Sequence, residues 1–153
     1  FFRQILLDRL TAPRPAVLVL SGSWQDSDMA QLGPTLAQLR KSAIPVLLVG
    51  PVPRYEEALP RLLVSATHFG QPDLVDRALL GETFRIDRDM ARIAGENGVR
   101  YFSPMTMLCR NRACRPYAAS GVPLQFDKGH LTPEGSALLT DALLPIVDEL
   151  AQR

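Results

Sequence analysis

Two residues near the C-terminus, Asp127 and His130, have types and a spacing that could move protons. Histidine can take up and return a proton near neutral pH. An aspartate beside one ring nitrogen can fix the tautomer, as in a Ser-His-Asp triad. Thr132 is a favourable N-cap and Pro133 a favourable first helical residue, so we expect a helix to begin here and to pin the loop before it. A surface aspartate and a histidine in a turn would have the same short spacing, so the pair by itself leaves both interpretations open.

The two cysteines, Cys109 and Cys114, have a Cys-x4-Cys spacing. They could form half of a zinc site, a disulfide or two unrelated thiols. A structural zinc site usually has four ligands, and only His68 and His130 could complete one. Because the surrounding loop is polar, we expect a disulfide, which persists in oxidising places such as the periplasm or the cell exterior. We expect neither a metal site nor a cofactor.

The length of 153 residues suits one domain with a sizeable core. The formal net charge of +1 gives no sign of a nucleic-acid surface. No apolar run approaches the roughly 18 residues that a membrane span needs. The chain starts at Phe1 rather than at a methionine and has no signal-peptide pattern. We therefore expect it to be part of a longer protein.

Short apolar runs alternate with segments of helical periodicity along the chain. Three apolar runs predict strands, at residues 16–20, 46–49 and 99–102. Helical spacing predicts helices at 1–10, at 32–39 with Pro34 near the start, at 86–94 with a stop at Gly98, and at 133–150 with a kink at Pro145. Residues 50–84 contain several prolines and glycines, so we expect an irregular segment with a short helix at 73–80.

This alternation predicts a parallel α/β sheet with helices on both faces. Ligands of such sheets bind beyond the carboxyl ends of the strands. The loop at residues 21–26 follows the first predicted strand, and the Asp127–His130 pair lies in the long loop after the third. We therefore expect these two loops to face one crevice.

Five segments share one further pattern. The block from Asp127 to Gly135 reads Asp-x-x-His-Leu-Thr followed by Pro-x-Gly. The others, in chain order, are AVLVLSGSW (16–24), VLLVGPVP (46–53), CRNRAC (109–114) and GVPLQFD (121–127). Together they resemble the periplasmic SGNH domain that is fused to the C-terminus of acyltransferase-3 membrane proteins. The resemblance extends from about Phe1 to Leu150.

The resemblance implies a three-layer α/β/α fold with a parallel sheet of the SGNH (flavodoxin-like) type. It implies that His130 is the base of a Ser-His-Asp unit and that Asp127 orients it. The family nucleophile stands in a Gly-Asp-Ser motif after the first strand, which these 153 residues do not contain. By comparison with the family, the strand predicted at 16–20 resembles the third strand of the SGNH sheet. We therefore expect residues 1–153 to be a partial SGNH domain, without its first strand or strands and inactive by itself. The alternative is a domain that has lost its nucleophile.

The residues after the first predicted strand depart from the family pattern. An asparagine of the oxyanion hole is expected there, but the chain has Gly22, Ser23 and Trp24. Backbone N–H groups of Gly22 or Ser23 could replace it. Trp24 matches a tryptophan of the membrane-fused subgroup and could stack on a sugar ring or pack in the core. Arg54 could contact an acidic sugar, although such an arginine is more often a solvated loop residue.

The implied function is the transfer of an acyl group, commonly acetyl, to a hydroxyl of a cell-surface polysaccharide. A carbohydrate esterase would use the same machinery. The implied location is the periplasmic side of an inner-membrane protein. The implied partners are a carbohydrate acceptor and a membrane-embedded acyltransferase domain of the same protein, which supplies the acyl group; no nucleic acid is implied. The alternative is a non-catalytic glycan-binding or scaffolding module.

Overall fold

The computed structural model describes residues 15–119 and 121–152, and the helix predicted at 1–10 lies outside them. A parallel sheet with the order β1-β2-β3 forms the centre, as predicted. Leu20 is opposite Leu48, and Val49 is opposite Phe102. The strands are β1 (Leu18–Leu20), β2 (Val46–Val49) and β3 (Arg100–Phe102).

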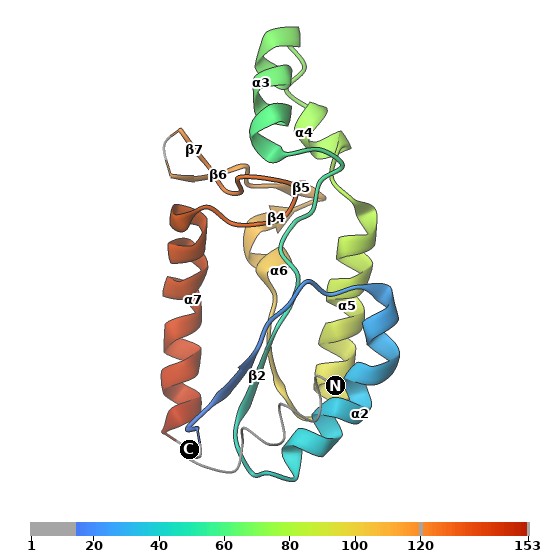
Figure 1. Cartoon of the computed structure of the whole chain (residues 1–153), viewed down its shortest axis with the longest axis vertical. Coiled ribbons are helices and arrows are strands. Elements are labelled where there is room, and N and C mark those ends of the chain that lie inside the picture. Colours follow the sequence, from blue (N-terminus) through green and yellow to red (C-terminus); the bar gives the residue numbers. More distant parts are fainter. Residues whose placement is uncertain (1–14, 120, 153) are drawn as a thin grey trace.

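Helices cover both faces of this sheet (Figure 1). On one face lie α2 (Met29–Arg40) and α5 (Gly81–Glu96), and on the other lies α7 (Pro133–Ala151). All four residues of β2 are buried, as expected of a strand covered on both faces. This arrangement confirms the three-layer α/β/α prediction.

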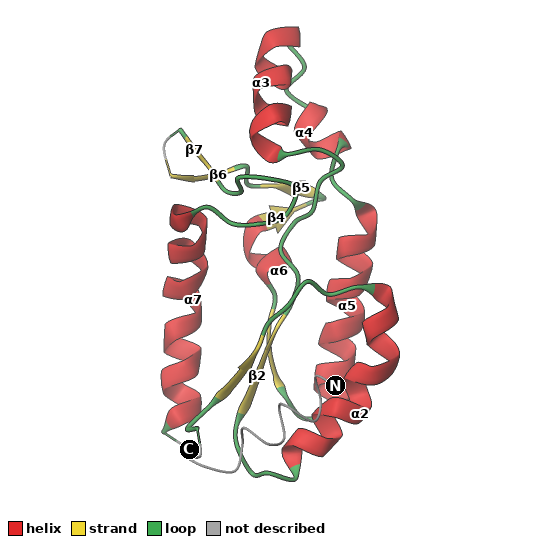
Figure 2. Cartoon of the chain, viewed as in Figure 1, coloured by secondary structure: helices red, strands yellow, loops and turns green. Residues whose placement is uncertain are grey.

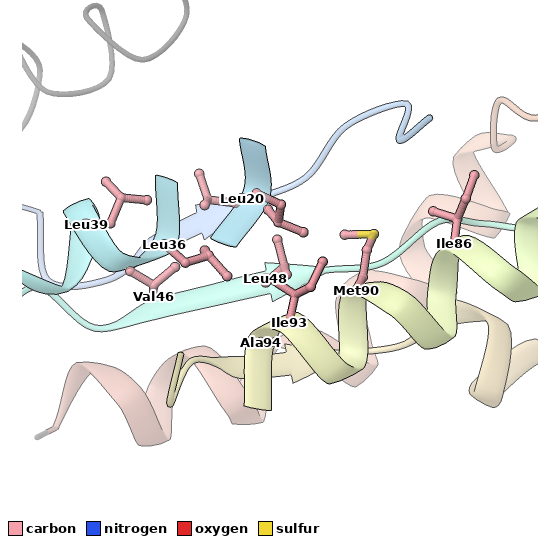
Figure 3. Close-up of a cluster of buried hydrophobic side chains, with 10 residues drawn as sticks. Leu20, Leu36, Leu39, Val46, Leu48, Ile86, Met90, Ile93 and Ala94 are labelled. Atoms are coloured by element: carbon pink, nitrogen blue, oxygen red, sulfur yellow. The ribbon is translucent and has the colours of Figure 1, made fainter. Parts of the chain in front are cut away.

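The side chains of β2 alternate between two clusters of the core, one on each face of the sheet. Leu48 meets Leu36 of α2 and Met90 of α5 in one cluster of buried side chains, which Figure 3 shows. Leu47 and Val49 point to the other face and pack against Leu150 and its neighbours in α7.

Strand β1 is less covered than predicted. Val19 lies beside Leu47 on the α7 face and is 44% exposed. The reason is its place at the edge of the described sheet, where β1 has β2 as its neighbour on one side.

Pro34 lies inside α2 rather than near its start, which corrects the prediction. A proline cannot donate to the carbonyl four residues earlier, here that of Ala30. Both residues are exposed, so water can satisfy this carbonyl. Burial of Leu32, Leu36 and Leu39 on the opposite side holds the helix together.

Residues 50–84 were predicted to be largely irregular, which is wrong for their centre. They contain α3 (Leu59–Phe69), and the short helix predicted at 73–80 is only α4 (Leu74–Arg77). Pro60 stands in the first turn of α3, where the missing N–H costs nothing, so it starts this helix instead of breaking it. Both helices project beyond the carboxyl ends of the strands, at the top of Figure 1.

The end of α5 and the start of α7 lie where they were predicted, whereas α5 begins at Gly81 rather than at residue 86. Gly98, with φ 61°, follows the end of α5 as expected. Helix α7 begins at Pro133 and continues through Pro145. None of the helices in the described ranges is long and apolar enough to cross a membrane.

The loop after β3 contains small elements that the sequence analysis did not predict (Figure 2). The two central residues of the first hairpin, Asn111 and Arg112, both have positive φ, as in a type I′ turn. This turn places Cys109 opposite Cys114, and a disulfide joins them as predicted. The elements of this loop are α6 (Pro104–Leu108), β4 (Cys109–Arg110), β5 (Ala113–Cys114), β6 (Tyr117–Ala119) and β7 (Val122–Pro123). A short 3-10 helix, η1 (Asp26–Asp28), lies between β1 and α2.

Candidate active site

The segment between β7 and α7 folds back on itself as a short antiparallel turn. Gln125 and Leu131 form its bridge, and the backbone N–H of Phe126 donates to the carbonyl of His130 over 3.0 Å. Asp127 and His130 therefore lie together at the closed end of the turn, as their spacing predicted.

The carboxylate of Asp127 accepts three hydrogen bonds. Its Oδ1 accepts from the backbone N–H of His130 at 2.7 Å and of Gly129 at 2.9 Å. Its Oδ2 is 2.6 Å from Nδ1 of the His130 ring. The backbone bonds from His130 and Gly129, and then the ring contact, lower the pKa of Asp127 from 3.8 to about 2. The group is therefore an anion at neutral pH, and an anion at this distance requires a proton on Nδ1.

The tautomer leaves Nε2 of His130 as the nitrogen that can exchange a proton. The His130 side chain is 79% exposed, and its ring stacks on Phe126 with the centroids 5.8 Å apart. Holding one nitrogen and exposing the other is the arrangement of a general base with its orienting carboxylate.

The start of α7 fixes this turn from its C-terminal side. Thr132 accepts from the N–H of Gly135 at 3.1 Å and donates its hydroxyl to the carbonyl of Pro123 at 2.9 Å. A Cβ on Gly135 would overlap with the carbonyl oxygen of Leu124. The Thr-Pro-x-Gly part of the motif therefore has a packing reason: it lets the helix start against the strand segment before the turn.

Hydrogen bonds tie the turn to the loop after β2 and to the start of α3. Backbone N–H groups of Tyr55 and Leu59 donate to the carbonyls of Lys128 at 3.0 Å and Asp127 at 3.1 Å. The side chain of Gln125 donates to the carbonyl of Pro53 at 2.7 Å. The sequence analysis missed Gln125, because nothing local marks a glutamine as fully buried.

An open groove of about 390 Å³ lies between this turn and the loops after β1 and β2. The prediction that the loop at 21–26 and the Asp127–His130 pair face one crevice is therefore confirmed. The lining also includes Arg54, which the sequence analysis had favoured as a solvated loop residue. The predicted site residues that line the groove are Gly22, Ser23, Trp24, Asp127 and His130.

A family model described as "SGNH domain (fused to AT3 domains)" matches residues 1–145. The chain belongs to this family. No curated protein sequence matches the chain.

Solved structures share the fold of this SGNH domain. The periplasmic domain of a lipopolysaccharide acetyltransferase from Salmonella ser. Paratyphi A matches with a TM-score of 0.78 and 19% identity, over 94% of this chain and 61% of that chain. A GDSL-like lipase from Bacteroides thetaiotaomicron matches with a TM-score of 0.53 and 16% identity, over 88% and 63% of the two chains. The SGNH domain described here thus spans less than two thirds of the length of either structure.

Trp24 packs against the core and also lines the groove. Its Nε1 donates to the carbonyl of Val49, at the end of β2, over 2.8 Å. The half-buried ring packs against the core cluster of α2 and α5 and also lines the groove of the SGNH domain. The indole therefore anchors the loop after β1, and part of its face remains available to a ligand.

Gly22 and Ser23 are exposed in the same loop of the SGNH domain. Among residues 15–119 and 121–152, neither backbone N–H has an acceptor. A Cβ on Gly22 would meet nothing within 4 Å. Within the described part of the chain, both N–H groups thus lack an acceptor, and both residues line the groove.

Proposed function

We propose that this SGNH domain transfers an acyl group, commonly acetyl, to a hydroxyl of a cell-surface polysaccharide. The observation that carries the proposal is the 2.6 Å contact between Nδ1 of His130 and Oδ2 of Asp127, at a groove beyond the carboxyl ends of the strands. The family description and the likeness to the periplasmic domain of an acetyltransferase support it.

In the proposed reaction, a serine hydroxyl attacks the acyl carbon of the donor, and Nε2 of His130 takes the hydroxyl proton. The new Ser–acyl bond forms as the bond to the donor breaks, and the leaving group receives that proton. In the second half, His130 takes the proton of a sugar hydroxyl as its oxygen attacks the acyl-serine. The bond from the acyl carbon to the serine oxygen breaks, and His130 returns the proton to that oxygen. Water in place of the sugar would make the domain an esterase.

The Ser-His-Asp unit also needs a serine. Residues 1–153 contain no Gly-Asp-Ser motif that would supply it. We place it in the remainder of the SGNH domain, in the full-length protein. The free N–H groups of Gly22 and Ser23 would receive the negative charge on the acyl oxygen, which such donors stabilise by about 3 kcal/mol each. Trp24 would offer its exposed face to the sugar ring.

The proposed location is the periplasm, and the proposed donor of the acyl group is a membrane-embedded AT3 domain of the same protein. The description of the family as fused to AT3 domains supports this arrangement. So does the disulfide between Cys109 and Cys114, which suits an oxidising compartment.

The test is acyl transfer by the full-length protein with His130→Ala and Asp127→Asn. We expect His130→Ala to lower the rate by several orders of magnitude, and Asp127→Asn to lower it by about 10⁴, because the ring would lose its fixed tautomer. The control is His68→Ala, which removes the only other histidine of the chain. Circular dichroism must show that each variant is folded. A folded His130→Ala protein that acylates its polysaccharide at the normal rate would favour the glycan-binding module instead.

A further inference from the structure

Arg54 has a special position in the groove. It lines the groove together with Trp24 and His130, and it also lines a neighbouring hollow that contains Ser27 and Glu82. Arg54 therefore borders both hollows.

The main chain and the stem of Arg54 are held in place. Its carbonyl accepts from the N–H of Leu80 at 2.8 Å. Its Cγ lies 3.5 Å from the point where a Cβ on Gly129 would be, so the stem rests on the turn that carries His130. The side chain is half-buried rather than free in solvent.

Within residues 15–119 and 121–152 the guanidinium of Arg54 has no hydrogen-bond or ion-pair partner. The exposed carboxylate of Glu82, in the second hollow, interacts electrostatically with Arg85. Three further charged groups along the hollows have partners of their own. The carboxylate of Asp127 is taken by His130 and Gly129. The Nζ of Lys128 donates to the carbonyl of Glu56 at 2.5 Å and lies 3.9 Å from Glu57. Asp26, in the second hollow, is paired with Arg85. The N–H donors of a half-buried guanidinium without a protein partner are free to bind an anionic ligand.

We propose that Arg54 binds an anionic group, a carboxylate or a phosphate, on the acceptor sugar. This inference rests on the proposed function and specifies its substrate class. The planar fork of a guanidinium matches both kinds of oxyanion with two parallel hydrogen bonds. Arg54 borders both hollows, whereas His130 lines only the groove. We therefore expect the anionic group bound by Arg54 to lie beside the hydroxyl that reacts at His130, and not at that hydroxyl. Arg54 is therefore a specificity residue and takes no proton in the reaction.

Binding can be tested without turnover. The probes are methyl β-D-glucuronide, glucose 6-phosphate and the neutral methyl β-D-glucoside, measured by saturation-transfer difference NMR on the full-length protein. We expect at least one of the two anionic probes to bind about tenfold more tightly than the neutral one, as a charge-assisted hydrogen-bond pair would give. The two anionic arms show whether a carboxylate or a phosphate is preferred. Equal binding of all three would overturn the proposal.

Substitutions locate the effect. Arg54→Gln should abolish the preference for the anion, and Arg54→Lys should keep part of it, because the charge remains but the fork is lost. The matched control is Arg88→Gln on the exposed side of α5, which removes the same charge away from both hollows and should keep the full preference. An equal loss in Arg88→Gln and Arg54→Gln would show a general charge effect and would contradict the proposal.

The binding test of Arg54 does not depend on the proposed role of His130 as the base. His130→Ala should keep the tenfold preference, since Arg54 and not His130 is the proposed partner of the anion. If His130→Ala leaves acyl transfer intact, the proposed reaction fails while Arg54 can still bind an anion. If Arg54→Gln lowers transfer to neutral and anionic acceptors by the same factor, the proposed reaction stands and the role of Arg54 in specificity is wrong.

Discussion

The side-chain amide of Gln125 donates to the backbone carbonyl of Pro53 over 2.7 Å, although 72 residues separate them in the chain. Gln125 is fully buried. The bond joins the turn of Asp127 and His130 to the loop of Arg54, so the proposed base and the proposed anion site share one support.

Gln125→Met should loosen this support. The substitution keeps the length of the side chain but leaves the carbonyl of Pro53 without a donor, which costs about 1–3 kcal/mol. The other atom of the amide, Oε1, is buried and has no partner among the described residues, so its removal offsets part of the loss. We expect a net loss of about 1 kcal/mol in urea unfolding and a lower rate of acyl transfer. The exposed Gln31→Met on α2 should change neither, and a loss as large there would contradict the assignment.

The carboxyl group of Asp127 should titrate at about pH 2 in ¹³C NMR of the folded protein, below its usual 3.8. Its pKa is depressed on folding, so the group stabilises the fold above pH 3.8, and this contribution is lost as the pH falls through about 2. In His130→Ala the backbone N–H bonds remain, so the pKa should rise only part of the way. A titration near 3.8 in the unmodified protein would show that the three hydrogen bonds do not form in solution.

Gly50→Ala should destabilise the domain. A Cβ at this position would collide with the hydroxyl of Tyr101 and lie 2.9 Å from Oδ1 of Asp87. That oxygen accepts from Tyr101 and from Ser103, each at 2.7 Å. Burial, helped by the bond to Asp87, raises the pKa of Tyr101, so the phenol remains a donor. Displacing it should cost about 1–3 kcal/mol in chemical denaturation.

The matched control for Gly50→Ala is Gly95→Ala on the exposed side of α5, where a Cβ would meet nothing within 4 Å. Alanine is the better helix former by about 1 kcal/mol, so this variant should be slightly more stable. Equal stability of the two variants would argue against the contact at Gly50.

Reducing the disulfide between Cys109 and Cys114 should lower the free energy of unfolding by about 2 kcal/mol, from the entropy of closing so short a loop. The measurement is urea unfolding with and without reductant, on protein made in an oxidising compartment. Thiol titration of the denatured, unreduced protein should find no free thiol. Two free thiols would refute the pairing.

Local signals in the sequence determined several elements. The four consecutive apolar residues of β2 can all be buried only if the strand is covered on both faces, and the strand does lie between two layers of helices. Thr132 and Pro133 start α7, and Gly98 follows the end of α5, because caps act within one turn of the chain. The Asp-x-x-His spacing placed Asp127 beside His130 for the same reason: a short turn leaves few other arrangements.

Tertiary structure decided what depends on distant segments. Pro60 looked like a break in the chain, but Leu59 and Leu62 are buried and make it the start of α3. The sequence favoured Arg54 as a solvated residue, but in the structure its aliphatic stem packs against the turn at Gly129. A glutamine is usually exposed, and Gln125 is buried because the carbonyl of Pro53 is there to pair with it. Residue type and spacing determine what a side chain can do, and only the packing of segments far apart in the sequence determines which partner it has.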